Sequence, residues 1–450
     1  MLWVAGWGCG PVPIPHWRDT NPNVTRVHVI GAGISGLSCA VRLAREGRAV
    51  TLYEAAGQAG GRCRSYHDAK LERSIDNGNH ILLSANLAAL SYLEEIGARH
   101  SLRAPQEAAY GFVDLRSGAR WTLRPNAGPL PWWILAPGRR VPGTRPGAYL
   151  AGLRLAFAKP SQTVAEVLDP ADPLWERFWE PLTVAALNTA PEEAAARLLW
   201  PVLRDTFGRG AAACRPLIAR DGLGASFIDP ALAVLREAGA EVRFNQRLRA
   251  IAFAGDRAAG LEFGTGSVAL GPNARVVIAV PPNVAAALLP GLTAPQEGRP
   301  IVNGHIRLAQ APPLAPGMTA ERPFLGLVGG AAQWLFLRGD VVSLTASAAA
   351  ELSTRPSEEI ARRFWADTAR ALNLDPNLDP AERPTIRIVK ERQATFAQTP
   401  AALGRRAPAR TRWANLALAG DWTDTGFPAT IESAVRSGRA AARVVTEDCR

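Results

Sequence analysis

Cysteine is scarce in this sequence. It occurs five times in 450 residues, and no two cysteines have the Cys-x-x-Cys spacing that is typical of zinc and redox sites. We therefore expect neither a disulfide framework nor a metal site. The cytoplasm is the expected compartment, because disulfides are a feature of oxidising compartments.

Long apolar runs are also missing. No uninterrupted apolar stretch reaches the roughly 20 residues that a bilayer-spanning helix needs. The N-terminus lacks the basic segment and apolar core of a signal peptide. We expect residues 1–23, which are rich in tryptophan, glycine and proline, to form a poorly ordered extension. Peripheral contact with the inner face of the plasma membrane stays open.

Acidic residues are outnumbered: 40 Asp and Glu stand against 51 Lys and Arg, which gives a net charge of +11. Such a balance is compatible with nucleic acid or an anionic membrane surface as a partner. We do not expect nucleic acid, because the sequence has no basic tail and no basic strand interleaved with aromatic residues. A chain of 450 residues that is 47% apolar is expected to be globular, with two or more subdomains.

A glycine-rich turn joins an apolar strand to a helix between Val27 and Leu37. Gly31 permits the tight turn, Gly33 lets the backbone approach a pyrophosphate, and Gly36 allows the helix to pack on its strand. The N–H groups that open the helix then face the phosphates, with the positive end of the helix dipole behind them. The nucleotide-binding residues expected here are Gly31, Gly33, Ile34, Ser35 and Gly36.

Glycine turns also occur in other α/β units, so the residues that follow this turn decide whether it belongs to a dinucleotide site. The helix stops at Gly47, and a second apolar strand, Ala49 to Tyr53, follows it. That strand ends at Glu54, whose carboxylate can accept from both hydroxyls of a ribose. The order of strand, glycines, helix, strand and terminal acid predicts a dinucleotide site.

A second glycine-rich segment, Ala55 to Ser65, follows and contains Gly61 and Arg62. It resembles the GG motif of the FAD-dependent amine oxidase and carotenoid desaturase superfamily, in which the glycines and the arginine lie along the dinucleotide. The resemblance implies that the cofactor is FAD, that Gly61 and Arg62 contact it, and that Val242 lies against its adenine side. An arginine-bearing surface loop is the alternative.

The C-terminal region carries the second decisive cluster. A buried strand from Leu416 ends in Gly420-Asp421, and a helix starts a few residues later, near Thr430 and Ile431. The Asp421 carboxylate can accept from ribityl hydroxyls, and the N–H groups that open the helix can face the electron-rich N1–C2=O edge of a flavin. An unrelated strand-turn-helix is the alternative.

Three longer segments point to one family within this superfamily. They are Asp76 to Leu83, Glu180 to Thr189 and Gly420 to Ala434. They resemble the hydroxysqualene dehydroxylases of the hopanoid pathway, formerly described as squalene-associated FAD-dependent desaturases. The resemblance extends over about residues 24 to 445. It implies that the chain is an FAD-dependent enzyme that reductively removes the hydroxyl group of hydroxysqualene to give squalene.

The segment around His80 is the candidate active site. The superfamily resemblance places it close to the flavin ring. Because an imidazolium can donate a proton near neutral pH, His80 is the first candidate for the acid that protonates the leaving hydroxyl, and Asp76 is the second. The structural alternative for His80 is a histidine that is simply hydrogen-bonded in a core.

The FAD elements occur at both ends and in the middle of the chain, so the expected fold is α/β and discontinuous. We expect a Rossmann-like FAD-binding domain with an inserted mixed α+β substrate domain, as in amine oxidases. The FAD-binding domain is assigned residues 24–100, 215–285 and 385–450. The substrate domain is assigned residues 101–214 and 286–384.

Three other functions stay open. A carotenoid or squalene desaturase would use the same flavin in the oxidative direction, and an amine oxidase would need a cage for a small cation. A non-catalytic flavoprotein partner of prenyl-lipid enzymes is the third. The expected partners are a water-insoluble isoprenoid substrate and an unidentified electron donor that reduces FAD again.

Two aromatic clusters bear on the substrate. Trp132 and Trp133 lie among prolines and aliphatic residues, with Arg139 and Arg140 just after them. Such a segment suits a lipid headgroup boundary, where it could admit a water-insoluble substrate, and an ordinary buried loop is the alternative. Further large rings that line either an apolar pocket or a plain core are Trp175, Phe178, Trp179 and Trp200.

Overall fold

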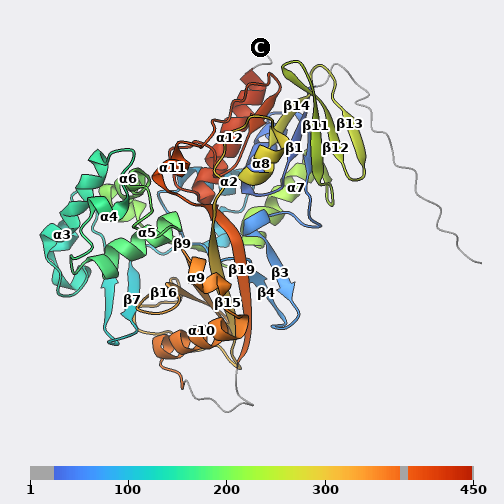
Figure 1. Cartoon of the computed structure of the whole chain (residues 1–450). Coiled ribbons are helices and arrows are strands. Elements are labelled where there is room, and N and C mark those ends of the chain that lie inside the picture. Colours follow the sequence, from blue (N-terminus) through green and yellow to red (C-terminus); the bar gives the residue numbers. More distant parts are fainter. Residues whose placement is uncertain (1–24, 376–383, 448–450) are drawn as a thin grey trace, which may run out of the picture.

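The computed structural model describes residues 25–375 and 384–447. The expected N-terminal extension, residues 1–23, lies outside the described residues. A five-stranded parallel sheet with the order β10-β2-β1-β14-β20 forms the upper part of Figure 1. Its strands are β1 (Arg26–Ile30), β2 (Ala49–Tyr53), β10 (Glu241–Arg243), β14 (Arg275–Ile278) and β20 (Leu416–Leu418). They come from three separate stretches of the chain, so the predicted discontinuous α/β domain is confirmed.

Both faces of this sheet are covered, which explains why β1, β2, β14 and β20 are mostly apolar and buried, whereas β10 at the sheet edge is Glu-Val-Arg and only partly buried. Helices α1 (Ile34–Arg45), α7 (Asp229–Glu237) and α12 (Ile431–Glu447) share a core with one face of the sheet. Helix α12 approaches α1 closely at Gly438, where a Cβ would lie 2.2 Å from the Ser35 carbonyl oxygen. The other face packs against α8 (Pro282–Leu288) and a three-stranded sheet made of β11 (Leu248–Ala254), β12 (Arg257–Phe263) and β13 (Gly266–Ala269).

A seven-stranded sheet with the order β19-β15-β18-β17-β16-β7-β8 forms the lower part of the molecule. The strands are β7 (Tyr110–Asp114), β8 (Arg120–Leu123), β15 (Gly298–Arg307), β16 (Phe324–Val328), β17 (Trp334–Arg338), β18 (Val341–Ala346) and β19 (Thr385–Phe396). Helix α10 (Ser357–Leu372) packs on one face through Ile360 and Phe364. The other face turns toward the candidate site.

Strand β19 corrects an expected boundary. We expected the chain to return to the nucleotide-binding domain at residue 385, but β19 begins there and pairs with β15 along its length. The reason is local: the segment begins Thr385-Ile386-Arg387-Ile388-Val389, and its β-branched residues favour a strand. The return follows Phe396, where α11 (Pro400–Leu403) and β20 come next.

Short strands connect the two large sheets. They are β3 (Ser65–Asp68), β4 (Arg73–Asp76), β5 (Leu82–Leu83), β6 (Leu102–Arg103) and β9 (Pro216–Ala219). Helix α2 (Leu87–Glu95) follows β5, and α9 (Ala350–Thr354) follows β18. In the described part of the chain, no helix combines the length and apolarity needed to traverse a bilayer.

A helical lobe lies to the left of both sheets in Figure 1. It contains α3 (Pro146–Leu150), α4 (Val164–Val167), α5 (Glu180–Leu187) and α6 (Ala196–Asp205). Trp175, Phe178 and Trp179 are buried in its core, with the Phe178 and Trp179 ring centroids 4.8 Å apart. These rings therefore form a core, which decides between the two alternatives considered for them; Trp200 is partly buried against the same core.

Candidate functional site

The turn between β1 and α1 is built around two glycines that the backbone requires. Gly31 has a φ of +106°, and a Cβ there would lie 2.3 Å from the Ala279 carbonyl oxygen. A Cβ on Gly36 would lie 1.9 Å from the Gly31 carbonyl oxygen. Both positions therefore exclude any side chain, as the sequence pattern predicts.

Gly33 differs from these two glycines. Its φ is −74°, and a Cβ there would meet nothing within 4 Å, so the protein itself leaves this side of the turn open. Gly33 is also the N-cap residue of α1, and within the described residues no side chain accepts a hydrogen bond as a cap of this helix. An open, uncapped start of a twelve-residue helix, with the N–H groups of Ile34 and Ser35 in its first turn, fits a pyrophosphate.

Glu54 stands at the end of β2, as expected. Its carboxylate accepts from the backbone N–H of Ala32 and of Ala56, each at 2.9 Å, so it holds the glycine turn against the next loop. A carboxylate has about four acceptor sites, which leaves capacity for ribose hydroxyls. Val242 pairs with Leu52 in the neighbouring strand, so the residue expected at the adenine side lies on the strand next to Glu54.

The second glycine-rich segment lies along the opening of α1. The Gly60 N–H donates to the Ala32 carbonyl oxygen at 2.8 Å, and a Cβ on Gly61 would lie 3.5 Å from the Cα of Gly33. The two glycine segments are thus neighbours in space, as the superfamily resemblance implies.

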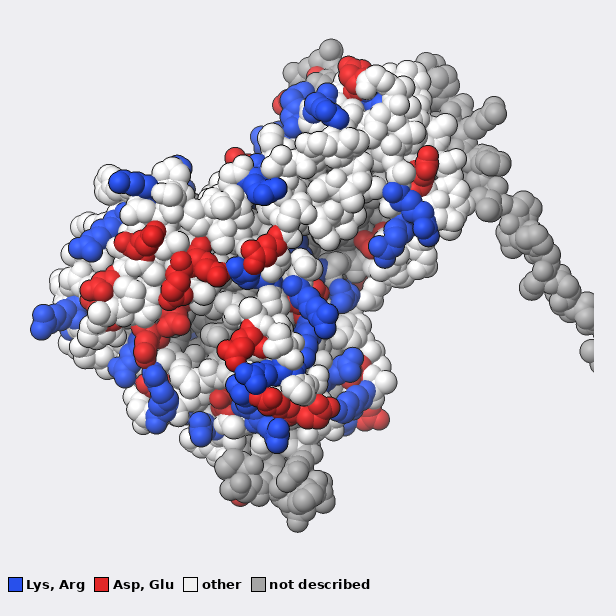
Figure 2. All heavy atoms as spheres, in the orientation of Figure 1, with Lys and Arg blue, Asp and Glu red and all other residues white. Residues whose placement is uncertain are grey.

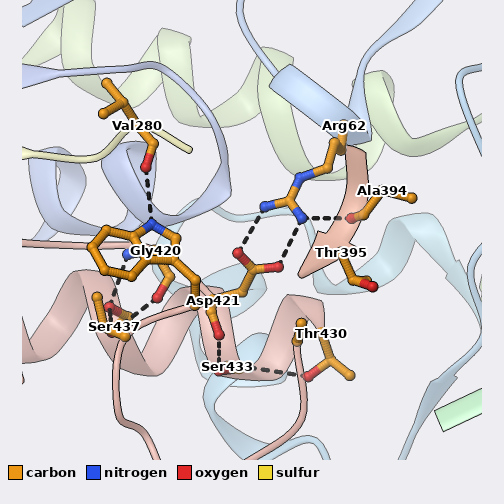
Figure 3. A network of polar contacts seen from close by, with 12 residues as sticks. Arg62, Val280, Ala394, Thr395, Gly420, Asp421, Thr430, Ser433 and Ser437 are labelled. Atoms are coloured by element: carbon orange, nitrogen blue, oxygen red, sulfur yellow. Dashed lines mark hydrogen bonds and ion pairs between the residues drawn. The ribbon is translucent and has the colours of Figure 1, made fainter. Parts of the chain in front are cut away.

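Arg62 joins this segment to the C-terminal cluster, as Figure 3 shows. Its guanidinium donates to both carboxylate oxygens of Asp421, at 2.7 and 2.9 Å, and to the Ala394 carbonyl oxygen at 2.6 Å. Burial opposes the charge of Arg62, but the Asp421 carboxylate outweighs it and raises the Arg62 pKa. Asp421 therefore has a partner that the sequence did not predict, and its remaining acceptor sites are available to ribityl hydroxyls.

The loop that carries Asp421 is fixed from both sides. Gly420 has a φ of +155°, and its N–H donates to the Ser437 hydroxyl of α12 at 2.9 Å. Helix α12 begins at Ile431, and the Thr430 hydroxyl accepts from the Ser433 N–H at 3.2 Å. The start of this helix thus lies beside Asp421, because the Ser433 hydroxyl donates to the Asp421 carbonyl oxygen at 3.3 Å.

Arg406 also holds this loop, and the sequence analysis missed it. Its buried guanidinium donates to the carbonyl oxygens of Thr423 (from Nε at 3.0 Å), Phe427 (2.9 Å) and Asp421 (3.2 Å). Burial lowers the pKa of Arg406. The residue lies in a basic, proline-containing stretch with no recognisable motif, so only the three-dimensional arrangement reveals it.

We expect Arg406→Met to lose FAD and to lower the free energy of unfolding by about 3 kcal/mol, because several buried carbonyl groups lose their donor. The matched control is Arg405→Met, since Arg405 is exposed on the same turn. Denaturant unfolding and the flavin content of the purified proteins measure both effects. Equal stability of the two variants would contradict the clamping role of Arg406.

The turn after β4 contains the two candidate acids. The buried Asp76 carboxylate accepts from the Ser65 hydroxyl at 2.5 Å, the Leu223 N–H at 2.9 Å and the Arg338 guanidinium at 2.8 Å. The Asp76 carboxylate thus joins three segments of the chain, and its oxygens are already occupied by these donors.

Replacing Asp76 tests this assignment. Asp76→Ala leaves three donors unpaired, so we expect a loss of about 3 kcal/mol in the free energy of unfolding. Asp76→Asn keeps an acceptor for two of them and is expected to lose less. Asp340→Ala breaks the more exposed ion pair with Arg73 and should cost at most about 1 kcal/mol, as urea unfolding would show. A fully stable but inactive Asp76→Asn would restore Asp76 as the acid.

The rest of the turn is fastened to the seven-stranded sheet. Asn79 donates to the Thr345 hydroxyl at 3.0 Å, and that hydroxyl donates to Asn303 at 2.8 Å. Asn303 in turn donates to the Asn77 carbonyl oxygen at 3.1 Å. This network leaves the turn little freedom, so His80 is held in a defined position.

His80 is partly buried, and its Nδ1 lies 3.4 Å from the Gly78 carbonyl oxygen. Burial lowers the pKa of His80, so the neutral imidazole predominates at neutral pH. Its ring faces a pocket between the turn, β9 and β17. The pocket is lined by His80 and Asp76 together with residues that include Asn79, Arg103, Arg220, Ile218, Leu223, Phe336 and Arg338.

The predicted residues therefore come together in one region. The turn that carries His80 is joined to the segment of Arg62, because the Asn77 N–H donates to the Arg64 carbonyl oxygen at 3.0 Å. From there Arg62 reaches Asp421, and Gly61 reaches Gly33. Glu54 and Val242 lie at the far end, beyond the glycine turn. The arrangement suits an extended dinucleotide with its reactive ring near the turn of His80.

Comparisons with known proteins agree with this arrangement. The chain matches the family model described as flavin containing amine oxidoreductase over residues 34–446. It is 48% identical to the hydroxysqualene dehydroxylase of Rhodopseudomonas palustris, over 93% of this chain and 98% of the relative. It is 43% identical to the hydroxysqualene dehydroxylase of Zymomonas mobilis, over 92% of this chain and 97% of the relative.

Solved structures show a similar fold at low sequence identity. An oxidoreductase of Methanosarcina mazei matches with a TM-score of 0.67 and 15% identity, over 93% of this chain and 100% of that chain. Cyclohexylamine oxidase of Brevibacterium oxydans matches with a TM-score of 0.65 and 17% identity, over 95% of this chain and 100% of that chain. These two likenesses concern the fold alone.

Proposed function

The chain belongs to the flavin containing amine oxidoreductases and, within them, to the hydroxysqualene dehydroxylases, and from this membership we propose that it converts hydroxysqualene to squalene. The observation that carries the proposal is that relatives of this name match almost the whole chain at 43% to 48% identity. The predicted family resemblance is confirmed, and the enzyme is an FAD-dependent oxidoreductase.

The residues present fit FAD. The open glycine turn at Gly33 and the α1 N-terminus would hold the pyrophosphate, and Glu54 would hold the adenosine ribose. Asp421 and the start of α12 would hold the ribityl chain and the ring. When bound and reduced, FAD supplies a hydride, so that hydroxysqualene, reduced FAD and a proton source give squalene, water and oxidised FAD.

The protein must supply a proton and keep water away. The hydroxyl carbon of hydroxysqualene is allylic, so protonation of the leaving oxygen produces a resonance-stabilised cation. Both His80 and Asp76 line the pocket, and His80 is the proposed donor because the Asp76 carboxylate already accepts from three donors. Its Nδ1 is turned toward the Gly78 carbonyl, which leaves Nε2 to carry the proton that is given to the substrate oxygen.

Part of the pocket wall is apolar. Ile218, Leu223 and Phe336 line it, and Phe336 belongs to a small buried cluster with Phe324. Such walls suit an isoprenoid chain and exclude water from the cation. Arg338 stays paired with Asp76, so its charge is balanced beside this apolar surface.

The proposal is tested against the oxidative alternative, a squalene or carotenoid desaturase. Anaerobic enzyme is incubated in four combinations, oxidised or reduced, with squalene or hydroxysqualene, and the extracted lipids are identified by mass spectrometry. We expect hydroxysqualene to be converted to squalene only by the reduced enzyme, and added squalene to stay unchanged with either form. A desaturated product from oxidised enzyme with squalene would overturn the proposal in favour of the desaturase.

A further inference from the structure

Exposed large apolar side chains are concentrated in one short part of the chain. Eight such side chains are exposed among the described residues, and six of them fall between residues 130 and 157. The six are Leu130, Trp132, Leu135, Leu150, Leu153 and Phe157. Phe157 is 87% exposed and Leu130 is 76% exposed, which is unusual for side chains of this size. We call these six residues the apolar face.

The apolar face belongs to an ordered part of the lobe. Trp133, next to the exposed Trp132, is buried, and its ring lies 5.1 Å from that of Tyr149. The Tyr149 ring lies 5.3 Å from that of Phe178 in the core of the lobe. The Asn126 side chain accepts from the Trp133 N–H at 3.0 Å and donates to the Leu130 carbonyl oxygen at 2.9 Å. The exposed side chains therefore project from a well-packed part of the lobe.

The charged residues of this stretch of sequence have one sign. Residues 115–165 contain eight basic residues and no acidic one. The five that lie between residues 130 and 160 are Arg139, Arg140, Arg145, Arg154 and Lys159, and none of the five has an ion-pair partner among the described side chains. Arg139 lies over the Trp132 ring, 4.9 Å from its centroid. Figure 2 shows basic side chains along the outer edge of the lobe that carries α3.

We propose that the apolar face docks on the surface of an anionic lipid bilayer. Leucine, phenylalanine and tryptophan side chains suit the boundary between headgroups and acyl chains, and arginines beside them suit anionic headgroups. A protein partner or a second copy of this chain would also cover apolar side chains. The absence of acidic residues over 51 positions, together with five basic residues without an ion-pair partner, favours an anionic surface.

Apolar side chains continue from the lobe toward the pocket of His80. The core of the lobe includes Phe112, whose ring centroid lies 5.6 Å from that of Trp334. Trp334 is 6.0 Å from Phe324, and Phe324 is 6.2 Å from Phe336, which lines the pocket. If the proposed function holds, the docked lobe places the bilayer and the pocket at two ends of one apolar region. The docking itself does not depend on that function.

Vesicle co-sedimentation of the holoenzyme without substrate tests the proposal. The vesicles consist of phosphatidylcholine alone or of phosphatidylcholine with phosphatidylglycerol. We expect binding to the anionic vesicles that weakens with added salt, and weak binding to the neutral ones. The variant Leu153→Asp/Phe157→Asp is expected to bind about a hundredfold more weakly, since it removes two side chains from the lipid phase. Both positions are exposed, so its fold is preserved.

The matched control is Leu314→Asp, which changes an equally apolar exposed side chain outside the apolar face and should bind like the parent. A second variant, Arg145→Glu/Arg154→Glu, should lose the preference for anionic vesicles. The proposal is overturned if the parent protein binds neither vesicle type or if the double aspartate variant binds as well as the parent. It is also overturned if analytical ultracentrifugation shows a dimer of the parent that this variant dissolves, since a second copy then covers the face.

Discussion

Gly33→Ala is expected to weaken FAD binding strongly while the apoprotein keeps its thermal stability. The added methyl group meets no protein atom within 4 Å, and the φ of −74° suits alanine. The same open space is where the pyrophosphate would approach the backbone, so the methyl group would collide with the cofactor. We expect FAD affinity to fall about a hundredfold, which corresponds to about 2.7 kcal/mol. Fluorescence titration of the apoprotein with FAD measures this.

Substitutions at two other glycines serve as controls for Gly33→Ala. A Cβ on Gly138 also meets nothing within 4 Å, and Gly138→Ala should bind FAD like the parent. A Cβ on Gly36 would lie 1.9 Å from the Gly31 carbonyl oxygen, so Gly36→Ala should lose stability and FAD together. Parent-like FAD affinity of Gly33→Ala would show that the phosphates do not lie beside this residue.

His80→Gln is expected to lower the rate of squalene formation by 10² to about 10⁴, the usual contribution of a positioned acid, with normal FAD content. Glutamine can donate a hydrogen bond but cannot release a proton. The matched control is His67→Gln, because His67 is exposed on β3 and should have no effect. A parent-like rate in His80→Gln would remove the assignment.

The pH dependence gives a second readout for His80. Burial lowers its pKa, so the protonated form is scarce at neutral pH and increases as the pH falls. For the parent enzyme, kcat/KM is therefore expected to rise as the pH falls from neutral toward the lowered pKa of His80, and to level off below that pKa. The His80→Gln profile should lack this rise. A profile that is the same in both proteins would assign the titration to another group.

The nucleotide site could be predicted because its chemistry depends on residues that are close in sequence. Gly31 and Gly36 are required by the shape of the backbone, and Glu54 lies at the end of a strand. Both features can be recognised within one stretch of about thirty residues. Strands β1, β2 and β20 were readable as well, since strands of a sheet that is covered on both faces are rich in apolar residues. The C-terminal Gly420-Asp421 pair was recognised because a buried strand leads directly into it.

Other parts of the site depend on partners far apart in the chain. Arg62 and Asp421 are separated by 359 positions, and Asp76 and Arg338 by 262, so no local pattern reveals either pair. Asp76 looked like a candidate acid for this reason, and only its three donors show its structural role. Arg406 could not be predicted either. Its partners are backbone carbonyl groups, which every residue has, so no sequence pattern marks them.

A single anaerobic turnover tests the central claim most directly. Holoenzyme is reduced, freed of excess reductant and mixed with hydroxysqualene, and the visible absorbance of the flavin is followed while squalene is quantified. The account predicts that the flavin is reoxidised and that squalene forms in equal amount. Flavin that stays reduced in the presence of hydroxysqualene, or that is reoxidised without squalene, would contradict it.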